Sequence, residues 1–309
     1  MKRILIVGSN GLLGQKLTTL FSKSKQYDII NASVEGNFFL EEKDFPYHQL
    51  DITKRSAVLK LVDFFQPEVI INTAAVTNVD LCETDRALAW KVNVSGVENL
   101  VYGAKMVGAK VIHFSSDYVF DGKNGPYSES DTPNPISYYG RTKLASENVL
   151  KLSGIPNVII RTMILYGIAN QVKDNFALWL ANNLSENKPI RVVDDQIGNP
   201  TLVDDLAYAV LKIVEYNRSG LFNIAGGELI SRYGFALALA KKFKFNKDLI
   251  TPIKTSILKQ PAQRPLKSGF IILKAETELN LKMSNVENGL TVFQNQFYHH
   301  QKNKEYHII

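Results

Sequence analysis

The sequence predicts an α/β fold: a doubly wound parallel sheet with a smaller C-terminal domain. Two observations predict it. Short apolar runs rich in β-branched residues alternate with helical periodicity through the first 163 residues. A glycine-rich turn joins the first of these runs to the first helix. Beyond Met163 the alternation loosens and prolines accumulate, which marks the second domain.

The first predicted strand is residues 3–7, "RILIV", an apolar run typical of a strand buried on both faces. A helix from Leu12 to about Ser22 follows, because its apolar residues fall on one side. Further buried strands are predicted at 27–33, 69–74, 110–116 and 157–162, with helices at about 54–65, 83–106 and 139–152. Beyond Met163 we expect helices at 174–186 and 203–216, a strand at 221–225 and a helical region from about Ser231. Pro252, Pro261 and Pro265 predict loops that line a site, and the tail 298–309 is expected to fray.

Composition excludes several classes of protein. The chain of 309 residues is 45% hydrophobic and 21% charged, an ordinary globular balance, and its one cysteine, Cys82, cannot form an intramolecular disulfide. No run approaches the roughly 18 apolar residues of a membrane span, so we expect a cytoplasmic protein. The net charge is +6 but the basic residues are scattered, so nucleic acid is not expected as a partner. His48 and His113 are isolated from the three histidines of the tail, and no metal site is predicted.

The glycine-rich turn "VGSNGLLG" predicts dinucleotide binding. Gly8 permits a tight turn, Gly11 lets the backbone approach a pyrophosphate, and Gly14 lets the helix pack closely on the sheet. The free N–H groups at the start of the helix then face the anion. The other residues expected at the cofactor in this turn are Asn10, Leu12 and Leu13.

The second strand bears on the choice of cofactor. The carboxylate that usually binds the adenosine ribose is expected at its end, where Ser33 stands, with Glu35 just beyond. A small hydroxyl leaves room for a 2′-phosphate, so we expect NADP(H) or NAD(H), with NADP(H) preferred. Asp51, followed by Ile52 in "LDIT", could bond the adenine amine or could cap the next helix.

The motif Tyr-x-x-x-Lys occurs three times, at Tyr139, Tyr208 and Tyr298. On a helix the two side chains share one face, and the ammonium group is expected to lower the pKa of the phenol so that it transfers protons near neutral pH. Only Tyr139 opens a helix shortly after a predicted strand, and open α/β sheets bind ligands at the carboxyl ends of their strands. Tyr138 points about 140° away from Lys143 on an ideal helix, so we assign the chemistry to Tyr139.

These motifs resemble one family. The glycine turn, "NTAAVTNVDLCE" (72–83), "FSSDYVFDG" (114–122) and "YYGRTK" (138–143) are similar to those of extended short-chain dehydrogenases/reductases with a Rossmann domain. More narrowly they resemble the dTDP-4-dehydrorhamnose reductases, and the resemblance continues through "DQIGNPT" (195–201) and "QRP" (263–265). Two departures are Met163 and the segment "PLKSGFIILK" after Arg264.

The resemblance implies roles for named residues. Ser116 would hold the substrate carbonyl, Tyr139 would protonate it, and Lys143 would tune the phenol and hold the nicotinamide ribose. Ser115 competes with Ser116, but adjacent strand residues face opposite sides and Ser116 matches the family position. Further cofactor contacts are implied at Ala74, Ala75 and Asn93, and substrate contacts at Asp117, Tyr118, Asn175, Gln196 and Arg264.

The resulting expectation is a two-domain reductase. The dinucleotide-binding domain covers 1–165 with about 200–225 returning to it, and the substrate domain covers 166–199 and 226–309. It would reduce the 4-keto group of a nucleotide-linked deoxysugar, dTDP-4-dehydro-L-rhamnose in the first instance, with NAD(P)H. One alternative is a non-catalytic NADP-binding subunit resembling the methionine adenosyltransferase beta subunit. Another is a nucleotide-sugar epimerase or dehydratase, which Asp117 disfavours because it is the one carboxylate there. Helices 83–106 and 139–152 could also pair with a second copy to form a homodimer.

Overall fold

A computed structural model describes residues 1–40 and 45–306. Its centre is a sheet of seven strands in the order β11-β6-β5-β4-β1-β2-β3, and every neighbouring pair is parallel. The strands are β1 (Lys2–Val7), β2 (Tyr27–Ser33), β3 (Tyr47–Gln49), β4 (Val69–Asn72), β5 (Lys110–Ser116), β6 (Asn157–Thr162) and β11 (Gly220–Asn223). The predicted doubly wound α/β fold is confirmed.

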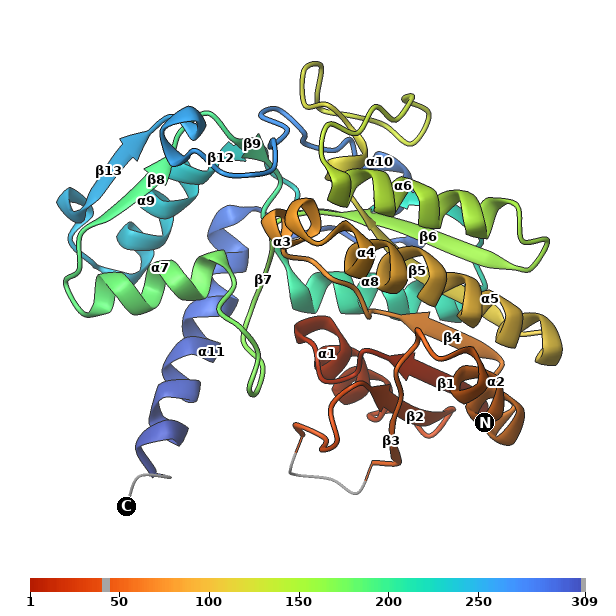
Figure 1. The fold of residues 1–309 in the computed structure, drawn as a ribbon. Coiled ribbons are helices and arrows are strands. Elements are labelled where there is room, and N and C mark those ends of the chain that lie inside the picture. The colour runs from red at the N-terminus through yellow and green to blue at the C-terminus, as the bar shows by residue number, and fades with distance from the viewer. Residues whose placement is uncertain (41–44, 307–309) are drawn as a thin grey trace.

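Helices cover both faces of this sheet (Figure 1). One face packs against α1 (Leu12–Phe21), α8 (Val203–Glu215) and α10 (Leu273–Leu279). The other packs against α2 (Arg55–Phe65), α5 (Gly96–Val107) and α6 (Tyr138–Lys151). Helix α10 contacts α8 and β11, although the sequence placed its residues in the substrate domain. The segment 273–279 therefore packs with the sheet, which periodicity alone did not indicate.

The long helix expected at 83–106 is interrupted. The structure has α3 (Val79–Thr84), α4 (Arg86–Trp90), a π-helical turn (Lys91–Ser95) and then α5. Asp85 separates the first two helices, because its backbone lies outside the helical region and its carboxylate accepts the N–H of Leu88. The prediction of a continuous helix was wrong here. Asp85 is the N-cap of α4, and a residue with the non-helical backbone of an N-cap also ends α3.

A second layer of structure lies beside the carboxyl ends of the sheet strands (Figure 1). Its hydrophobic core is formed largely by buried side chains of α7 (Phe176–Ser185), α9 (Arg232–Phe243) and α11 (Val286–Tyr306). Three two-stranded sheets complete it: β7 (Leu165–Tyr166) with β10 (Thr201–Leu202), β9 (Ile197–Gly198) with β12 (Ile230–Ser231), and β8 (Ile190–Val193) with β13 (Ile250–Ile253). Short 3₁₀ turns lie at Asp117–Val119, Lys247–Leu249 and Thr255–Leu258.

Two expectations for the C-terminal part were wrong. Pro252 lies inside β13, a strand of a two-stranded sheet, where a residue without an N–H is tolerated. The tail does not fray over its described part, because α11 continues to Tyr306 and residues 307–309 lie outside the described residues. Within the described ranges, no helix combines the length and the apolar character needed to cross a bilayer.

Candidate active site

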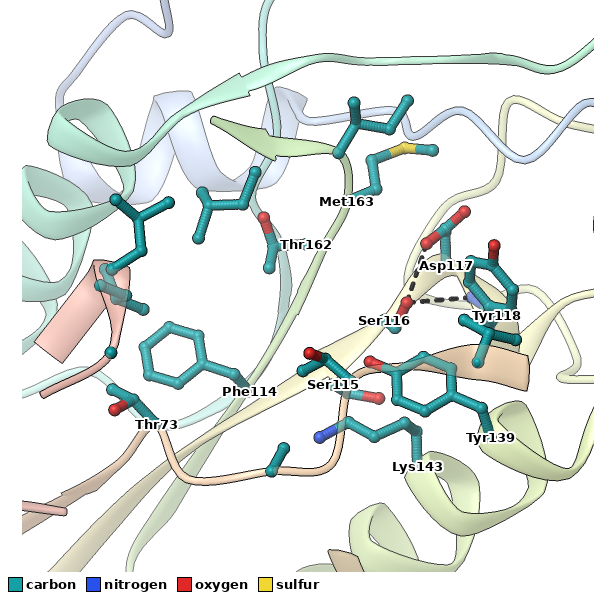
Figure 2. A pocket seen from close by; sticks show the side chains of 18 of the residues that line it. Thr73, Phe114, Ser115, Ser116, Asp117, Tyr118, Tyr139, Lys143, Thr162 and Met163 are labelled. Atoms are coloured by element: carbon teal, nitrogen blue, oxygen red, sulfur yellow. Dashed lines mark hydrogen bonds between the residues drawn. The ribbon is translucent and has the colours of Figure 1, made fainter. Parts of the chain in front are cut away.

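The carboxyl ends of β4, β5 and β6 open onto a pocket of about 510 Å³ (Figure 2). Its wall includes ten residues that the sequence singled out: Gly11, Leu12, Leu13, Ala74, Ala75, Ser116, Asp117, Tyr118, Tyr139 and Lys143. They come from the glycine turn, the segment after β4, the end of β5 and the start of α6. The structure thus brings the predicted dinucleotide turn and the predicted reactive residues into one space.

The glycine turn is built for close approach. Gly8 has φ +77°, and a Cβ there would lie 2.6 Å from the backbone nitrogen of Ala74. A Cβ at Gly14 would lie 2.4 Å from the Gly8 carbonyl oxygen, so α1 can start close to the strand only with glycine at this position. Gly11 is the N-cap of α1 and no side chain caps the helix, which leaves its first N–H groups available to an anion. These features fit a pyrophosphate group.

A carboxylate does lie beside the glycine turn at the end of β2. The Glu35 carboxylate accepts the Ser33 hydroxyl at 2.6 Å and the side-chain amide of Asn10 at 3.2 Å. The side chain of Glu35 therefore folds back to the place where a ribose carboxylate is expected. The sequence places Ser33 at this position, and in the structure the Ser33 hydroxyl holds Glu35 there.

The other two residues predicted for the adenine end lie apart from the pocket. Asp51 accepts the backbone N–H of Thr53 at 2.9 Å and so stabilises the turn before α2, whose N-cap is Lys54. The side chain of Ile52 is buried in the core, where it packs against Gly96 of α5. Ile52 can therefore offer a ligand only its backbone.

The two serines at the end of β5 face different neighbours. The Ser115 hydroxyl donates to Glu147 at 2.7 Å, and both residues are buried. The Ser116 hydroxyl donates to Asp117 at 2.8 Å and lies close enough to the Tyr139 phenol to lower its pKa (Figure 2). The geometry therefore favours Ser116 over Ser115 as the hydroxyl that shares a substrate atom with Tyr139.

Burial dominates the ionisation of the tyrosine and the lysine. It raises the pKa of Tyr139, to which the negative charge of Asp117 adds, and it lowers the pKa of Lys143 to about 8. The expected acidification of the phenol by the ammonium group is wrong, since burial raises the pKa of Tyr139. Tyr139 is consequently protonated at neutral pH, as a proton donor must be.

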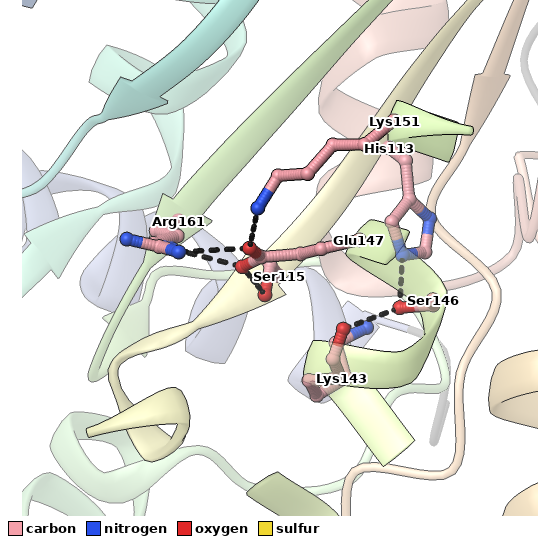
Figure 3. Close-up of polar contacts among 7 residues, drawn as sticks. All are labelled: His113, Ser115, Lys143, Ser146, Glu147, Lys151 and Arg161. Atoms are coloured by element: carbon pink, nitrogen blue, oxygen red, sulfur yellow. Dashed lines mark hydrogen bonds and ion pairs between the residues drawn. The ribbon is translucent and has the colours of Figure 1, made fainter. Parts of the chain in front are cut away.

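A buried polar network holds α6, which carries Tyr139 and Lys143, against the sheet (Figure 3). The Glu147 carboxylate accepts two bonds of 2.8 Å from the Arg161 guanidinium, and Lys151 donates to it at 3.1 Å. Glu147 and Arg161 are 0% and 1% exposed, so the pair is almost fully removed from water.

A second chain of hydrogen bonds fixes the backbone of α6 at Lys143 itself (Figure 3). The Ser146 hydroxyl donates to the Lys143 carbonyl at 2.7 Å and lies 2.9 Å from His113 Nε2, while Asn72 lies 3.2 Å from His113 Nδ1. His113 then donates from Nε2 and accepts at Nδ1. Burial and the nearby Lys143 charge lower its pKa, so His113 is neutral. Its role is to position α6.

The pocket continues into a second cavity of about 330 Å³ beside the C-terminal layer. Gln196, Arg264 and Tyr118, which the sequence predicts as substrate contacts, line it, and so does Arg232 at the start of α9, which the sequence did not single out. Arg232 donates to the Gln196 side chain at 3.1 Å and lines both cavities. The stacked rings of Phe176 and Trp179 form part of the same wall.

Three residues that the sequence predicts as ligand contacts have hydrogen-bond partners within the protein. Asn93 is buried, and its amide bonds to the backbone of Val76 and to Thr142. Asn175 caps α7 and donates to the Gly167 carbonyl, and it does not line either cavity. Arg264 does line the second cavity, while its guanidinium pairs with Asp80 at 2.8 Å.

Comparison with known proteins decides the family. The profile of the RmlD substrate binding domain family matches residues 1–299. The chain belongs to this family. The dTDP-4-dehydrorhamnose reductase of Aggregatibacter actinomycetemcomitans is 31% identical over 302 residues, covering 94% of this chain and 97% of the relative. The methionine adenosyltransferase 2 subunit beta of Mus musculus is 31% identical over 282 residues, covering 89% and 82%.

A solved structure agrees with the sequence match. The dTDP-4-dehydrorhamnose reductase of Bacillus anthracis, determined in complex with NADP, is 32% identical and covers 95% of this chain and 99% of that one, with a TM-score of 0.83. As a member of this family, the chain is classed among the NAD(P)-dependent oxidoreductases.

Proposed function

We propose that the protein reduces the 4-keto group of a nucleotide-linked deoxysugar, with dTDP-4-dehydro-L-rhamnose as substrate and dTDP-L-rhamnose as product. The observation that carries this proposal is the meeting of Tyr139, Lys143 and Ser116 in the pocket that the glycine turn enters. The similar reductases support the choice of sugar. We also propose that the reaction takes place in the cytoplasm. Pairing of copies through 83–106 and 139–152 stays a prediction.

The residues divide the work of the reduction. A bound reduced dinucleotide would supply the hydride for C4 of the sugar. Tyr139 donates its phenolic proton to the ketone oxygen, and the product is an alcohol at that carbon. Ser116 holds the same oxygen, and Lys143 places its ammonium group where it stabilises the phenolate left on Tyr139. Proton donation contributes about 10²–10⁴-fold to the rate.

The second cavity would bind the nucleotide half of the substrate. Arg232 and Arg264 line it, and guanidinium groups bind diphosphate oxygens through paired N–H donors. Trp179 offers a ring face to a base, while Phe176 stacks on Trp179 and lies under the Arg232 guanidinium. Because Arg232 also reaches the first pocket, a diphosphate bound there would leave its sugar beside Tyr139.

The position of Glu35 leads us to propose that NAD(H) is accepted at least as well as NADP(H), in place of the preference expected from Ser33. Ser33 and Asn10 hold the carboxylate beside the glycine turn, and among the described residues the lowering of its pKa comes from hydrogen bonds and not from a cation. A 2′-phosphate would therefore meet a negative charge, whereas a ribose hydroxyl would meet an acceptor.

Replacing Glu35 with Gln should shift the cofactor preference. The ratio of kcat/KM for NADPH to that for NADH is expected to rise roughly 5- to 10-fold, since like charges about 4 Å apart in water repel by about 1 kcal/mol. Steady-state kinetics with both dinucleotides measure it. Glu68→Gln, at the opposite end of the sheet, is the control and should leave the ratio unchanged. An unchanged ratio in the Glu35 variant would remove this residue from cofactor selection.

The pKa of Lys143, lowered to about 8, predicts the alkaline limb of activity. A lysine with a lowered pKa carries its charge below that pKa and loses it as the pH rises. We therefore expect kcat/KM for the dinucleotide, which reports on the free enzyme, to fall above about pH 8 while Tyr139 is still protonated. Lys143→Arg keeps a charge at all accessible pH values, so this variant should be slower but should lack that limb. The same limb in both proteins would contradict the assignment.

Two other functions compete with this proposal. The similarity to the methionine adenosyltransferase beta subunit favours a binding subunit that holds a dinucleotide without turnover. An epimerase or dehydratase would regenerate its dinucleotide in each cycle. Incubation with NADH or NADPH and a dTDP-4-keto-6-deoxysugar tests all three. Stoichiometric loss of absorbance at 340 nm supports the reductase, whereas binding without turnover, or product formation without net oxidation, supports the alternatives.

A further inference from the structure

The segment 265–271, which we call the strap, is bonded to two parts of the chain that are far apart in sequence. It includes part of the sequence that departs from the family pattern after Arg264. Backbone bonds join it to the loop after β5, through Gly122 and Tyr127, and to β9, through Ile197. The contact is close, because a Cβ on Gly125 would lie 2.2 Å from the Lys267 carbonyl oxygen. These contacts hold the backbone of the strap in one position relative to the loop after β5.

One side chain of the strap, Ser268, bonds to Asp117 at the end of β5. The Ser268 hydroxyl donates to Asp117 Oδ2 at 2.6 Å, across 151 residues of sequence. The other carboxylate oxygen, Oδ1, accepts the Ser116 hydroxyl at 2.8 Å. Ser268 and Asp117 are 3% and 5% exposed, so water does not compete freely for either oxygen.

We propose that Ser268 is a positioning residue that holds the Asp117 carboxylate so that its other oxygen fixes the Ser116 hydroxyl beside Tyr139. The inference rests on the proposed function, in which the one proton of the Ser116 hydroxyl turns from Oδ1, which holds it before the substrate binds, to the ketone oxygen. With Oδ2 engaged by Ser268, Oδ1 is the oxygen left for Ser116. Without Ser268 the carboxyl group can rotate about its side-chain bond, and Ser116 loses its fixed direction.

The charges around Asp117 set the sign of the effect. The groups that face it are the phenols of Tyr118 and Tyr139 and the guanidinium of Arg232. Burial raises the pKa of Asp117, while the bonds from Ser268 and Ser116 and the charge of Arg232 lower it. Removing the Ser268 hydroxyl should therefore raise this pKa further. Activity that needs the carboxylate is present above the pKa, so the acid limb of the pH profile should move to higher pH.

The test compares Ser268→Ala with the wild-type enzyme and with Ser153→Ala. Ser153 is also buried, but its hydroxyl bonds only to backbone at the end of α6. We expect Ser268→Ala to lower kcat/KM for the keto sugar about 10-fold, the size of one lost hydrogen bond to a charged group, and to move the acid limb upward. Ser153→Ala should do neither. Should Ser268→Ala fail to fold, Ser268→Cys keeps the shape of the side chain with a weaker donor and should shift the limb in the same direction.

A readout without turnover separates this inference from the proposed function. The carboxyl carbon of Asp117, assigned with Asp117→Asn, can be titrated by ¹³C NMR in the ligand-free protein. A higher midpoint in Ser268→Ala than in the wild type supports the contact, and identical midpoints with identical acid limbs would overturn the inference. If the midpoint shifts but the wild type reduces no keto sugar, the proposed function fails and Ser268 keeps a structural role alone.

Discussion

Tyr139→Phe is expected to lower the rate of keto-sugar reduction by about 10²–10⁴-fold while leaving the dinucleotide bound. The phenol is protonated at neutral pH and lies in the pocket with Ser116 and Lys143. Removing its oxygen takes away the proton donor and leaves the ring and its packing in place. Single-turnover measurement of reduced dinucleotide consumption gives the rate, and dinucleotide fluorescence gives the binding.

The neighbouring tyrosine supplies the matched control. Tyr138 does not line the pocket, and its ring packs on the Arg86 guanidinium at 5.1 Å. Tyr138→Phe should therefore retain nearly the full rate. The account would be contradicted if Tyr139→Phe kept the wild-type rate or if Tyr138→Phe lost it.

Glu147→Ala should have the largest effect on stability. The substitution leaves the Arg161 guanidinium, which is 1% exposed, without its carboxylate partner. Breaking a buried ion pair from one side typically costs about 3–5 kcal/mol of unfolding free energy, because the remaining charge stays buried and unpaired. The bond from Ser115 is lost as well. Urea denaturation measures the change in the free energy of unfolding.

Two comparisons make this result specific. Glu186, exposed at the end of α7, pairs with Lys188, and Glu186→Ala should change the unfolding free energy by no more than about 1 kcal/mol. The double variant Glu147→Leu with Arg161→Met should be more stable than Glu147→Ala, since it removes both charges. A loss in Glu147→Ala no larger than that in Glu186→Ala would show that the pair does not hold α6.

The sequence predicted those parts of the site that depend on residues close together in the chain. The spacing of Gly8, Gly11 and Gly14 predicted the turn, because the need for glycine at these positions arises largely from backbone within the turn itself. Tyr139 was chosen over Tyr208 and Tyr298 by its place after a strand. The structure puts Tyr208 on the exposed surface of α8, where Lys212 lies over its ring at 5.2 Å.

The residues that the sequence did not reveal act across long separations. Arg232 lines both cavities because α9 of the second layer begins beside the end of β5. No local sequence pattern predicts this placement of α9. Ser268 meets Asp117 across 151 residues, in a segment that looked only like a departure from the family. Glu35 was visible, but its bond to Ser33, which turns it toward the glycine turn, was not.

The central claim is a hydride transfer to a sugar ketone beside Tyr139. Incubating the protein with NADH or NADPH in which both C4 hydrogens of the nicotinamide ring are deuterium and with dTDP-4-dehydro-L-rhamnose, then analysing the sugar by NMR, tests it most directly. We predict one deuterium at C4 of the product sugar, with one dinucleotide oxidised for each sugar reduced. Oxidation without deuterium at C4, or no reaction while the dinucleotide is bound, would contradict the account.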